Sequence, residues 1–244
     1  CKVDMPTTKK TFSKSPSNPS NILSKLKSQN LIIASTQDEQ EALIYLSFIG
    51  GYRLKGYYYH LLNASKQFPS PYQFKDIIDR YEFDKELRSL TISAVDILEV
   101  ALRVTMSNTL SLKHGSHWYL DTSLFKSINK WTFGQQLSKI ESETIRAEKR
   151  RFVNHYFAQY DDPYLPPSWV VSECVTFGLW SRTYSILKDP HDKKSISMKF
   201  GIDKTDVFQS WIHAIYVMRN IAAHNGRILR NKFDVAPANN KGLN

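Results

Sequence analysis

Hydrophobic residues recur along most of the chain at the three- to four-residue spacing of an amphipathic helix, and the strict alternation of a half-buried strand is rare. This pattern predicts helices over about 22–30, 37–49, 52–63, 73–113, 133–159, 168–188, 192–200 and 206–225. Turn residues separate them, at Gly50-Gly51, Pro69 to Pro71, Gly115, Asp161 to Pro163, Pro166-Pro167, Asp189-Pro190 and Gly201. Because no internal repeat is present, we predict an all-α protein built as an irregular helical bundle.

The two ends of the chain differ from this body. Residues 1–20 are rich in Ser, Thr, Pro and Lys, and residues 231–244 are also polar, with little hydrophobic periodicity in either. We predict a flexible basic tail over 1–20 and a polar tail over 231–244. The single helical domain is expected over 21–230, within which 21–70 could form an N-terminal subdomain.

The positive charge lies mostly at these ends. The net charge is +10, and residues 1–30 hold six lysines against one aspartate, while residues 219–244 hold five basic residues against one aspartate. Basic charge next to a phosphate site attracts nucleic acid and speeds its encounter with the protein. The alternative is that a basic tail is merely solvated and disordered.

Several function classes lack their sequence signals. Only two cysteines occur in 244 residues, which argues against a disulfide framework and favours a cytoplasmic location. No apolar run approaches the roughly 18 residues of a membrane span. His114 and His117 have a metal-compatible spacing, but no cysteine is near and Gly115 indicates a turn. The chain has neither a phosphate-binding Gly-x(4)-Gly-Lys-Ser/Thr loop nor a Gly-x-Ser-x-Gly elbow, so we expect neither nucleoside-triphosphate chemistry nor serine hydrolysis. We expect no metal, no cofactor and no membrane partner.

The strongest candidate for chemistry is the segment from Arg219 to His224 in the last predicted helix. An arginine holds a phosphate with a permanent charge, and a histidine exchanges protons near neutral pH. The spacing alone is weak evidence, since Arg53 with His60 and Arg150 with His155 also fit it.

Helical geometry distinguishes this pair from the other two. At 100° per residue, one stripe of the helix is apolar and predicted to face the core, and it comprises Phe208, Trp211, Ile215, Met218 and Ala222. Asn220 and His224 lie on the opposite side, with Val217 and Ile221 beside them. We therefore expect a second protein surface to cover that side. Arg219 lies on the flank, where small residues at 222 and 223 would let a substrate or another backbone approach.

A second polar pair lies on the long predicted helix, where Glu99 precedes Arg103 by one turn. Such a pair is commonly a surface ion pair. The apolar residues around it, Ile97, Leu98, Ala101 and Leu102, indicate burial instead, and a buried pair usually has a reason. Both interpretations stay open.

Other basic residues are candidates for contact with RNA, namely Arg53, Lys55, Arg88, His155, Arg227 and Arg230. The tyrosines at 57–59 could stack bases next to Arg53 and Lys55, although a role as core residues with solvated hydroxyls is favoured. His155 could instead join two helices through a hydrogen bond.

Taken together, the chain resembles the Abi-like proteins of bacterial abortive infection, the AbiD and AbiF group, within the HEPN superfamily of helical ribonucleases. The resemblance covers most of residues 21–231. It rests on the order and spacing of Gly51-Tyr52-Arg53-Leu54, Gly56-Tyr57, Tyr81-Glu82-Phe83-Asp84, Leu87-Arg88-Ser89-Leu90, Ile97 to Arg103, His155-Tyr156, Leu165-Pro166-Pro167-Ser168-Trp169, Glu173, Phe177-Gly178, Ser210-Trp211-Ile212-His213, Arg219-Asn220 and Ala223-His224.

The resemblance implies a ribonuclease site formed by Arg219, Asn220 and His224, with Glu99 and Arg103 as the acidic and basic residues of an earlier helix. It also implies a homodimer in which the last helices of the two copies meet, so that the two Arg219 to His224 motifs lie together at the interface. Asn225-Gly226 departs from the pattern, because a longer helix would hold His224 more stiffly.

The expected function is a metal-independent endoribonuclease, a toxin of antiviral defence that leaves 2′,3′-cyclic phosphate and 5′-hydroxyl ends. His224 would act as general acid or base, Arg219 would neutralise phosphoryl charge, and Asn220 would orient one of them or the substrate. The alternative is a catalytically silent module that binds RNA or protein. Expected partners are the RNA substrate, a second copy, and a regulatory RNA or antitoxin protein.

Overall fold

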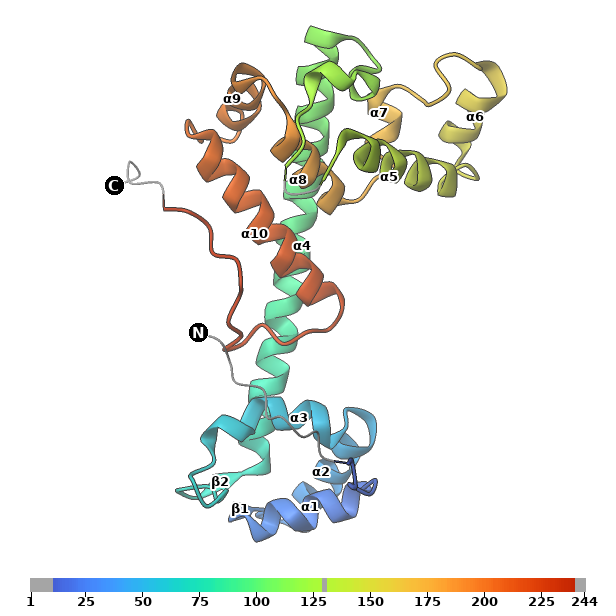
Figure 1. Ribbon diagram of the computed structural model, residues 1–244. Helices are drawn as coiled ribbons and strands as arrows, with labels where there is room; N and C mark the ends of the chain where they lie inside the picture. Colours follow the sequence, from blue (N-terminus) through green and yellow to red (C-terminus); the bar gives the residue numbers. More distant parts are fainter. Residues whose placement is uncertain (1–10, 129–130, 240–244) are drawn as a thin grey trace. The chain divides into compact units, whose positions relative to one another are not determined.

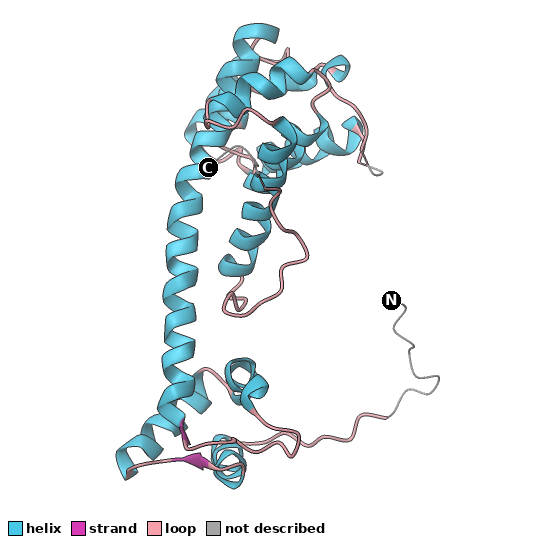
Figure 2. Ribbon diagram, turned by 90° about the vertical axis from the view of Figure 1, so that its left-hand side faces the viewer, coloured by secondary structure: helices cyan, strands magenta, loops and turns pink. Residues whose placement is uncertain are grey.

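The computed structural model describes residues 11–128 and 131–239 (Figure 1). Residues 1–10 of the predicted basic tail and 240–244 of the predicted polar tail lie outside these ranges. Within them the chain is predominantly helical, with ten α-helices and only two short strands (Figure 2), so the all-α prediction is confirmed. The chain divides into two compact units, one ending at Glu86 and the other beginning at Leu87, inside the long helix α4.

The first unit contains three helices and the start of a fourth. These are α1 (Pro19–Ser28), α2 (Thr36–Phe48), α3 (Gly51–Tyr58) followed by a 3₁₀ turn (Tyr59–Leu61), and the first part of α4 (Phe74–His114). Strands β1 (Leu31–Ile32) and β2 (Tyr72–Gln73) pair in parallel. Two residues are too few to show an alternating pattern, so neither strand was predicted. The expected subdomain over 21–70 lies within this unit.

The tyrosines at 57–59 divide between the core and the surface. Tyr57 and Tyr58 are buried, whereas Tyr59 is half exposed. The Tyr57 hydroxyl donates to a carboxylate oxygen of Asp84 at 2.7 Å, and the Tyr57 ring meets the edge of Tyr81 with a centroid separation of 5.6 Å. The core interpretation is thus confirmed for two of the three residues, although the Tyr57 hydroxyl is buried rather than solvated.

The second unit comprises the rest of α4 and six further helices. They are α5 (Phe133–Arg146), α6 (Arg151–Gln159), α7 (Ser168–Val171), α8 (Phe177–Ile186), α9 (Pro190–Met198) and α10 (Thr205–Ala223), with 3₁₀ turns at Trp118–Leu120 and Thr122–Leu124. Its core gathers aromatic and aliphatic side chains from α4, α5, α8, α9, α10 and the connecting segments, including Leu102, Met106, Trp118, Trp180, Tyr184 and Phe208.

The helices predicted over 133–159 and 168–188 are each divided into two, and a long-range hydrogen bond lies at each break. The backbone N–H of Thr176 donates to a Glu143 carboxylate oxygen at 2.7 Å, and α8 begins only after this extended residue. Arg150, which separates α5 from α6, donates from its side chain to the Glu173 carbonyl at 2.6 Å. Local periodicity carries no information about such contacts.

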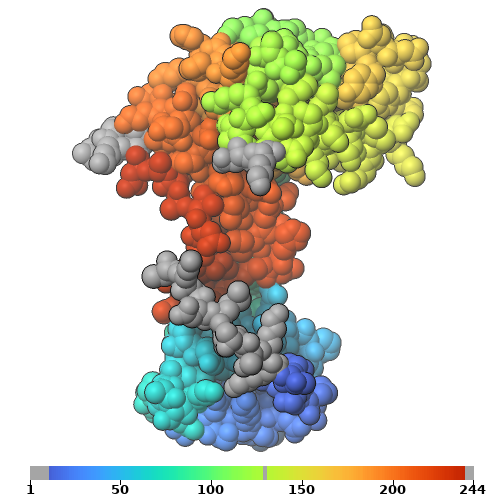
Figure 3. All heavy atoms as spheres, viewed as in Figure 1, coloured from blue at the N-terminus to red at the C-terminus, as the bar shows by residue number. Residues whose placement is uncertain are grey.

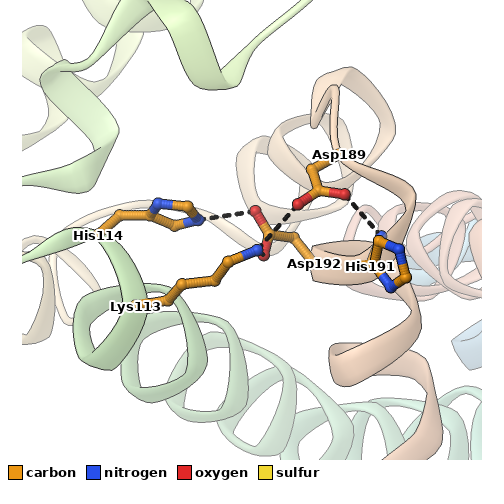
Figure 4. Close-up of polar contacts among 5 residues, drawn as sticks. All are labelled: Lys113, His114, Asp189, His191 and Asp192. Carbon is orange, nitrogen blue, oxygen red and sulfur yellow. Dashed lines mark hydrogen bonds and ion pairs between the residues drawn. The ribbon is translucent and has the colours of Figure 1, made fainter.

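An ionic cluster joins the end of α4 to the start of α9 (Figure 4). Lys113 Nζ lies 2.8 Å from Asp189 and 2.6 Å from Asp192, and His114 Nε2 lies 2.8 Å from Asp192. Asp189 also caps α9 by accepting from the backbone N–H of His191. Basic side chains at a helix C-terminus and acidic ones at an N-terminus match both helix dipoles. The cluster therefore fixes α9, against which α10 packs.

Candidate functional site

Helix α10 carries the Arg219 to His224 motif and is held by one buried stripe. The buried residues are Val207, Phe208, Ile212 and Ala222. Trp211, which the pattern placed in the core, is 44% exposed, so this part of the prediction is wrong. Its indole N–H instead donates to the Ala238 carbonyl at 3.0 Å, and the Ala238 N–H donates to Ser210 Oγ at 2.8 Å. The polar C-terminal segment is thus tied to the first half of α10.

The helix ends in a Schellman motif, with His224 as its C-cap. Asn225 has a φ of +56° and donates its N–H to the Ala222 carbonyl at 3.0 Å, while the Gly226 N–H donates to the Ile221 carbonyl at 2.7 Å. A Cβ on Gly226 would lie 2.8 Å from Ile221 Cγ2, so the close return of the chain requires glycine here. These bonds give the helix a defined end at His224, even though no further turn follows.

The same return of the chain covers part of the face that we expected a second protein surface to cover. Ile221 packs against Gly226, and both Ile221 and Val217 are only partly exposed. Ala222 is buried and Ala223 is exposed, so only Ala223 leaves room for an approaching group. The apolar surface next to Asn220 and His224 is therefore smaller than the sequence pattern indicated.

Arg219 lies between α10 and α4. Its Nη2 atom is 3.8 Å from Glu99 Oε2, and its Nη1 atom donates to Asn220 Oδ1 at a long 3.5 Å. The Arg219 side chain is 38% exposed and the Glu99 side chain 15% exposed. The guanidinium is therefore oriented from one side by a carboxylate and an amide, while part of it stays open to a ligand.

Glu99 and Arg103 form no ion pair with each other among the described residues, because each has another partner. Arg103 Nη2 lies 3.2 Å from Glu173 Oε2, in the segment after α7. Arg103 thus links α4 to that segment, whereas Glu99 belongs to the Arg219 site. The sequence spacing linked the wrong partners, since it reveals only neighbours on one helix.

The segment around Glu99 is also less buried than predicted. Ile97 is 71% exposed and Leu98 is 37% exposed, whereas Leu102 is buried. The reason is that α4 contributes one face to the core of the second unit, and the other positions of this stretch face solvent.

His224 is exposed, and its imidazole has no hydrogen-bond or ion-pair partner within the part of the chain that the structure describes. Its backbone N–H donates to the Asn220 carbonyl at 3.0 Å. His224 follows Arg219 by five positions, which corresponds to about 140° around the helix and roughly 7.5 Å along it. Arg219 is directed toward α4, where Glu99 lies. Within one chain, the two side chains therefore start from different sides of α10.

Two further candidates follow the motif directly. Arg227 is partly exposed and Arg230 is exposed, and Ile228 between them is buried. The C-terminal end of a helix carries partial negative charge that disfavours a phosphate. Arg219, Arg227 and Arg230 supply positive charge at this end, where Arg230 is exposed and the other two are partly exposed. Figure 3 shows atoms of the C-terminal part of the second unit, in red, at the surface.

The remaining candidates lie elsewhere. Arg53 and Lys55 are on α3 of the first unit, where Lys55 Nζ is 4.5 Å from the centroid of the Tyr59 ring. Arg88 is only 4% exposed, which leaves little of it for direct contact with RNA. His155 is exposed on α6, well apart from the end of α10 (Figure 1), and it makes no hydrogen bond to another helix in the described ranges. The suggestion that it joins two helices is wrong.

The two histidines with metal-compatible spacing have other contacts. His114 binds Asp192, and His117 contacts Ser116 Oγ at 2.9 Å and the Tyr156 hydroxyl at 3.4 Å. Burial lowers the pKa of His117 below its usual value. Among residues 11–128 and 131–239, no three His, Cys, Asp or Glu side chains are grouped as a metal site, and no helix is long and apolar enough to cross a membrane.

These features define an all-α protein whose last helix ends in a partly exposed Arg-Asn-x(3)-His motif, with a glutamate next to the arginine. A family model described as Abi-like protein matches residues 44–230, most of the chain. The chain therefore belongs to the Abi-like family, and this membership indicates a role in abortive-infection defence. No curated protein and no solved structure matches it.

Proposed function

We propose that this Abi-like protein is a metal-independent endoribonuclease that acts as a toxin in abortive infection. The observation that carries the proposal is the Arg219 guanidinium, which Glu99 and Asn220 orient at the exposed end of α10 that also bears His224. A fixed cation and a free imidazole are the two groups needed to cleave a phosphodiester next to a ribose hydroxyl.

The reaction needs one proton acceptor and one proton donor. A base removes the proton of the ribose 2′-hydroxyl, and the 2′-oxygen then attacks the adjacent phosphorus. The bond from phosphorus to the 5′-oxygen breaks, and an acid protonates that oxygen. The products are a 2′,3′-cyclic phosphate and a 5′-hydroxyl. His224 is exposed and able to serve as the acid or the base, a role worth about 10²- to 10⁴-fold in rate.

Arg219 would stabilise the negative charge that grows on the phosphoryl oxygens during the attack. Because Glu99 approaches it from α4 at 3.8 Å, only the open side of the guanidinium is available to the phosphate. Asn220 accepts from Arg219 and is placed to orient it. Arg227 and Arg230 would offset the negative end of the helix dipole and attract the RNA.

A second copy of the chain would complete the site. Arg219 and His224 leave α10 about 140° apart, so the two groups of one chain do not converge from their helix positions. Two α10 ends meeting across a twofold axis would bring the histidine of each copy near the arginine of the other. The exposed Ala223 and His224 offer room for this contact.

The second candidate function is a catalytically silent module that binds RNA or protein, and the solvated His224 favours it. No described residue of the same chain orients the imidazole. In that case Arg219 would only bind phosphate and would take no part in catalysis. A regulatory RNA or an antitoxin protein would be the ligand.

Cleavage of RNA in the presence of EDTA separates the two functions. We expect the wild-type protein to cut in EDTA and to leave cyclic phosphate ends, and His224→Ala to lose cutting but keep binding. His191→Ala is the matched control, because His191 is also exposed but lies on α9, outside the site. Cutting that EDTA abolishes, or full cutting by His224→Ala, would refute the proposed mechanism. Binding without any cutting would assign the silent module.

A further inference from the structure

A groove of about 490 Å³ lies in the second unit, next to the first half of α10. It is bordered by α8, α9 and α10, and most of its lining residues have polar or charged side chains. Its lining includes Arg182, Ser185, Lys193, Asp206, Gln209 and His213. None of them was a candidate site residue in the sequence.

Lys193 is a half-buried cation of this groove with only neutral partners. Its Nζ atom donates to the Ser185 carbonyl at 2.8 Å and to Gln209 Oε1 at 3.0 Å. Asp206 is the only carboxylate in the lining, and no ion pair joins it to Lys193 in the described part of the chain. Burial, together with the nearby charge of Lys126, lowers the pKa of Lys193 to about 8.

Four other lysines differ from Lys193 in having a carboxylate partner. Those at 27, 75, 85 and 113 each lie within 2.8 Å of a carboxylate oxygen, and all of them are more open to water. Removing an ammonium from water without an opposite charge is costly. A bound anion in the groove would supply the charge that Lys193 lacks.

Arg182 provides a second cation for the same groove. Its guanidinium lies over the Trp131 ring, 4.7 Å from the centroid, and it forms no ion pair within the described ranges. Stacking on the indole fixes the guanidinium without neutralising it, so its N–H groups stay available to an anion. His213, exposed on α10, lines the groove as well.

The groove shares one face of α10 with Asn220 and His224 of the motif. Gln209, His213, Tyr216, Asn220 and His224 follow each other at spacings of four, three, four and four residues, which keeps them within about 80° of one another. From His213 to His224 the helix rises roughly 16 Å, or about five nucleotides of a stacked strand. A strand that follows this face would reach both places.

We propose that the groove is a phosphate-binding subsite in which Lys193 and Arg182 hold a backbone phosphate of an RNA strand that lies along α10. This inference rests on the proposed function, because it assigns the ligand of the groove to the same RNA that is cut near His224. The strand would be held several nucleotides away from the scissile bond.

The test is the binding of a labelled single-stranded DNA of roughly 12 nucleotides, which lacks the 2′-hydroxyl and is not cleaved. We expect Lys193→Gln and Arg182→Gln each to weaken binding roughly tenfold. Each should also lower the slope of the logarithm of the binding constant against the logarithm of the salt concentration by about 0.7, the value for one phosphate contact to a single strand. Lys188→Gln and Arg151→Gln remove exposed charges outside the groove and should bind like the wild type.

Gln209→Glu separates a binding role from a structural one. The nearly isosteric carboxylate would pair with Lys193 and occupy the place of the phosphate, so we expect a higher melting temperature together with binding that is about tenfold weaker. Gln159→Glu, exposed on α6, controls for the added charge. If Gln209→Glu and Lys193→Gln both bind DNA like the wild type, the subsite does not exist.

Two further measurements separate the possible failures. If the wild type cuts no RNA but Lys193→Gln still weakens DNA binding, the ribonuclease proposal fails and the subsite stands. If the wild type cuts RNA and both groove variants bind normally, only the subsite fails. Adenosine monophosphate is the probe for a free nucleotide. If adenosine monophosphate displaces the labelled strand at the same concentration as unlabelled DNA, the groove binds a free nucleotide, and the proposal that it binds a strand is overturned.

Discussion

The Arg219 guanidinium on α10 lies 3.8 Å from the Glu99 carboxylate on α4, across 120 positions of sequence. The contact is long and Arg219 is partly exposed, so it contributes little to stability, on the order of 0 to 1 kcal/mol. The contact instead orients the guanidinium, because one side of it faces Glu99 on α4 and the other side is left for a phosphate.

A double-mutant cycle tests this relationship. We expect Arg219→Ala to reduce RNA cleavage by about 10²- to 10³-fold and Glu99→Gln by roughly tenfold, since the guanidinium would lose its orientation. In the Arg219→Ala background, Glu99→Gln should then have no further effect. Asp96→Asn, exposed on the same helix, serves as the control. Independent effects, in which the two factors multiply in the cleavage rate, would show that Glu99 does not act through Arg219.

Mixing two inactive variants tests the shared site. Arg219→Ala and His224→Ala each disable the motif of their own chain. If every site takes its arginine from one copy and its histidine from the other, a mixed dimer retains one intact site. Random exchange of equal amounts should therefore recover about a quarter of the wild-type cleavage rate. Recovery of no activity, with exchange of subunits demonstrated independently, would place both groups in a single chain or exclude the dimer.

Gly226→Ala should disturb the turn that ends α10. The new Cβ would meet Ile221 Cγ2 at 2.8 Å and the Ile221 carbonyl oxygen at 2.9 Å. We expect a loss of about 1–3 kcal/mol in the free energy of unfolding, with reduced cleavage, because His224 lies in the displaced turn. Gly134→Ala is the matched control, since its nearest neighbour is 3.9 Å away, and it should stabilise by about 0.4–1 kcal/mol. Denaturant unfolding measures both, and equal effects would contradict the packing argument.

The ionic cluster at the start of α9 predicts a dependence of stability on pH. The Lys113 side chain, followed by the His191 N–H, holds the pKa of Asp189 below its usual value. A lowered folded-state pKa means that this stability is present above the pKa of the unfolded chain and is lost as the pH falls through the folded pKa. The pKa of Lys113 is raised by its bonds to Asp189 and Asp192, so its contribution is lost only at strongly alkaline pH.

Asp189→Asn is the variant that checks this prediction. It should lower the melting temperature at pH 7 and reduce the slope of stability against pH in the acid range. Asp234→Asn, which removes an exposed carboxylate after α10, should change neither. An unchanged acid slope in Asp189→Asn would mean that the cluster does not contribute to acid unfolding.

The sequence by itself determined the helical class and most helix positions. The long helix predicted over 73–113 is observed as Phe74–His114, and the last one predicted over 206–225 as Thr205–Ala223. These features follow from local rules, since backbone hydrogen bonds link residues four apart and the apolar stripe repeats every 3.6 residues. The Arg219 to His224 motif was also visible, because its residues lie on one helix.

Only the tertiary structure decided which residues from distant segments meet. It paired Glu99 with Arg219 rather than with Arg103, and it broke a predicted helix where Thr176 binds Glu143. It also left Lys193 half buried among neutral partners in a groove between three helices. Such contacts depend on how helices pack against one another, and the spacing of residues within one helix carries no record of that packing.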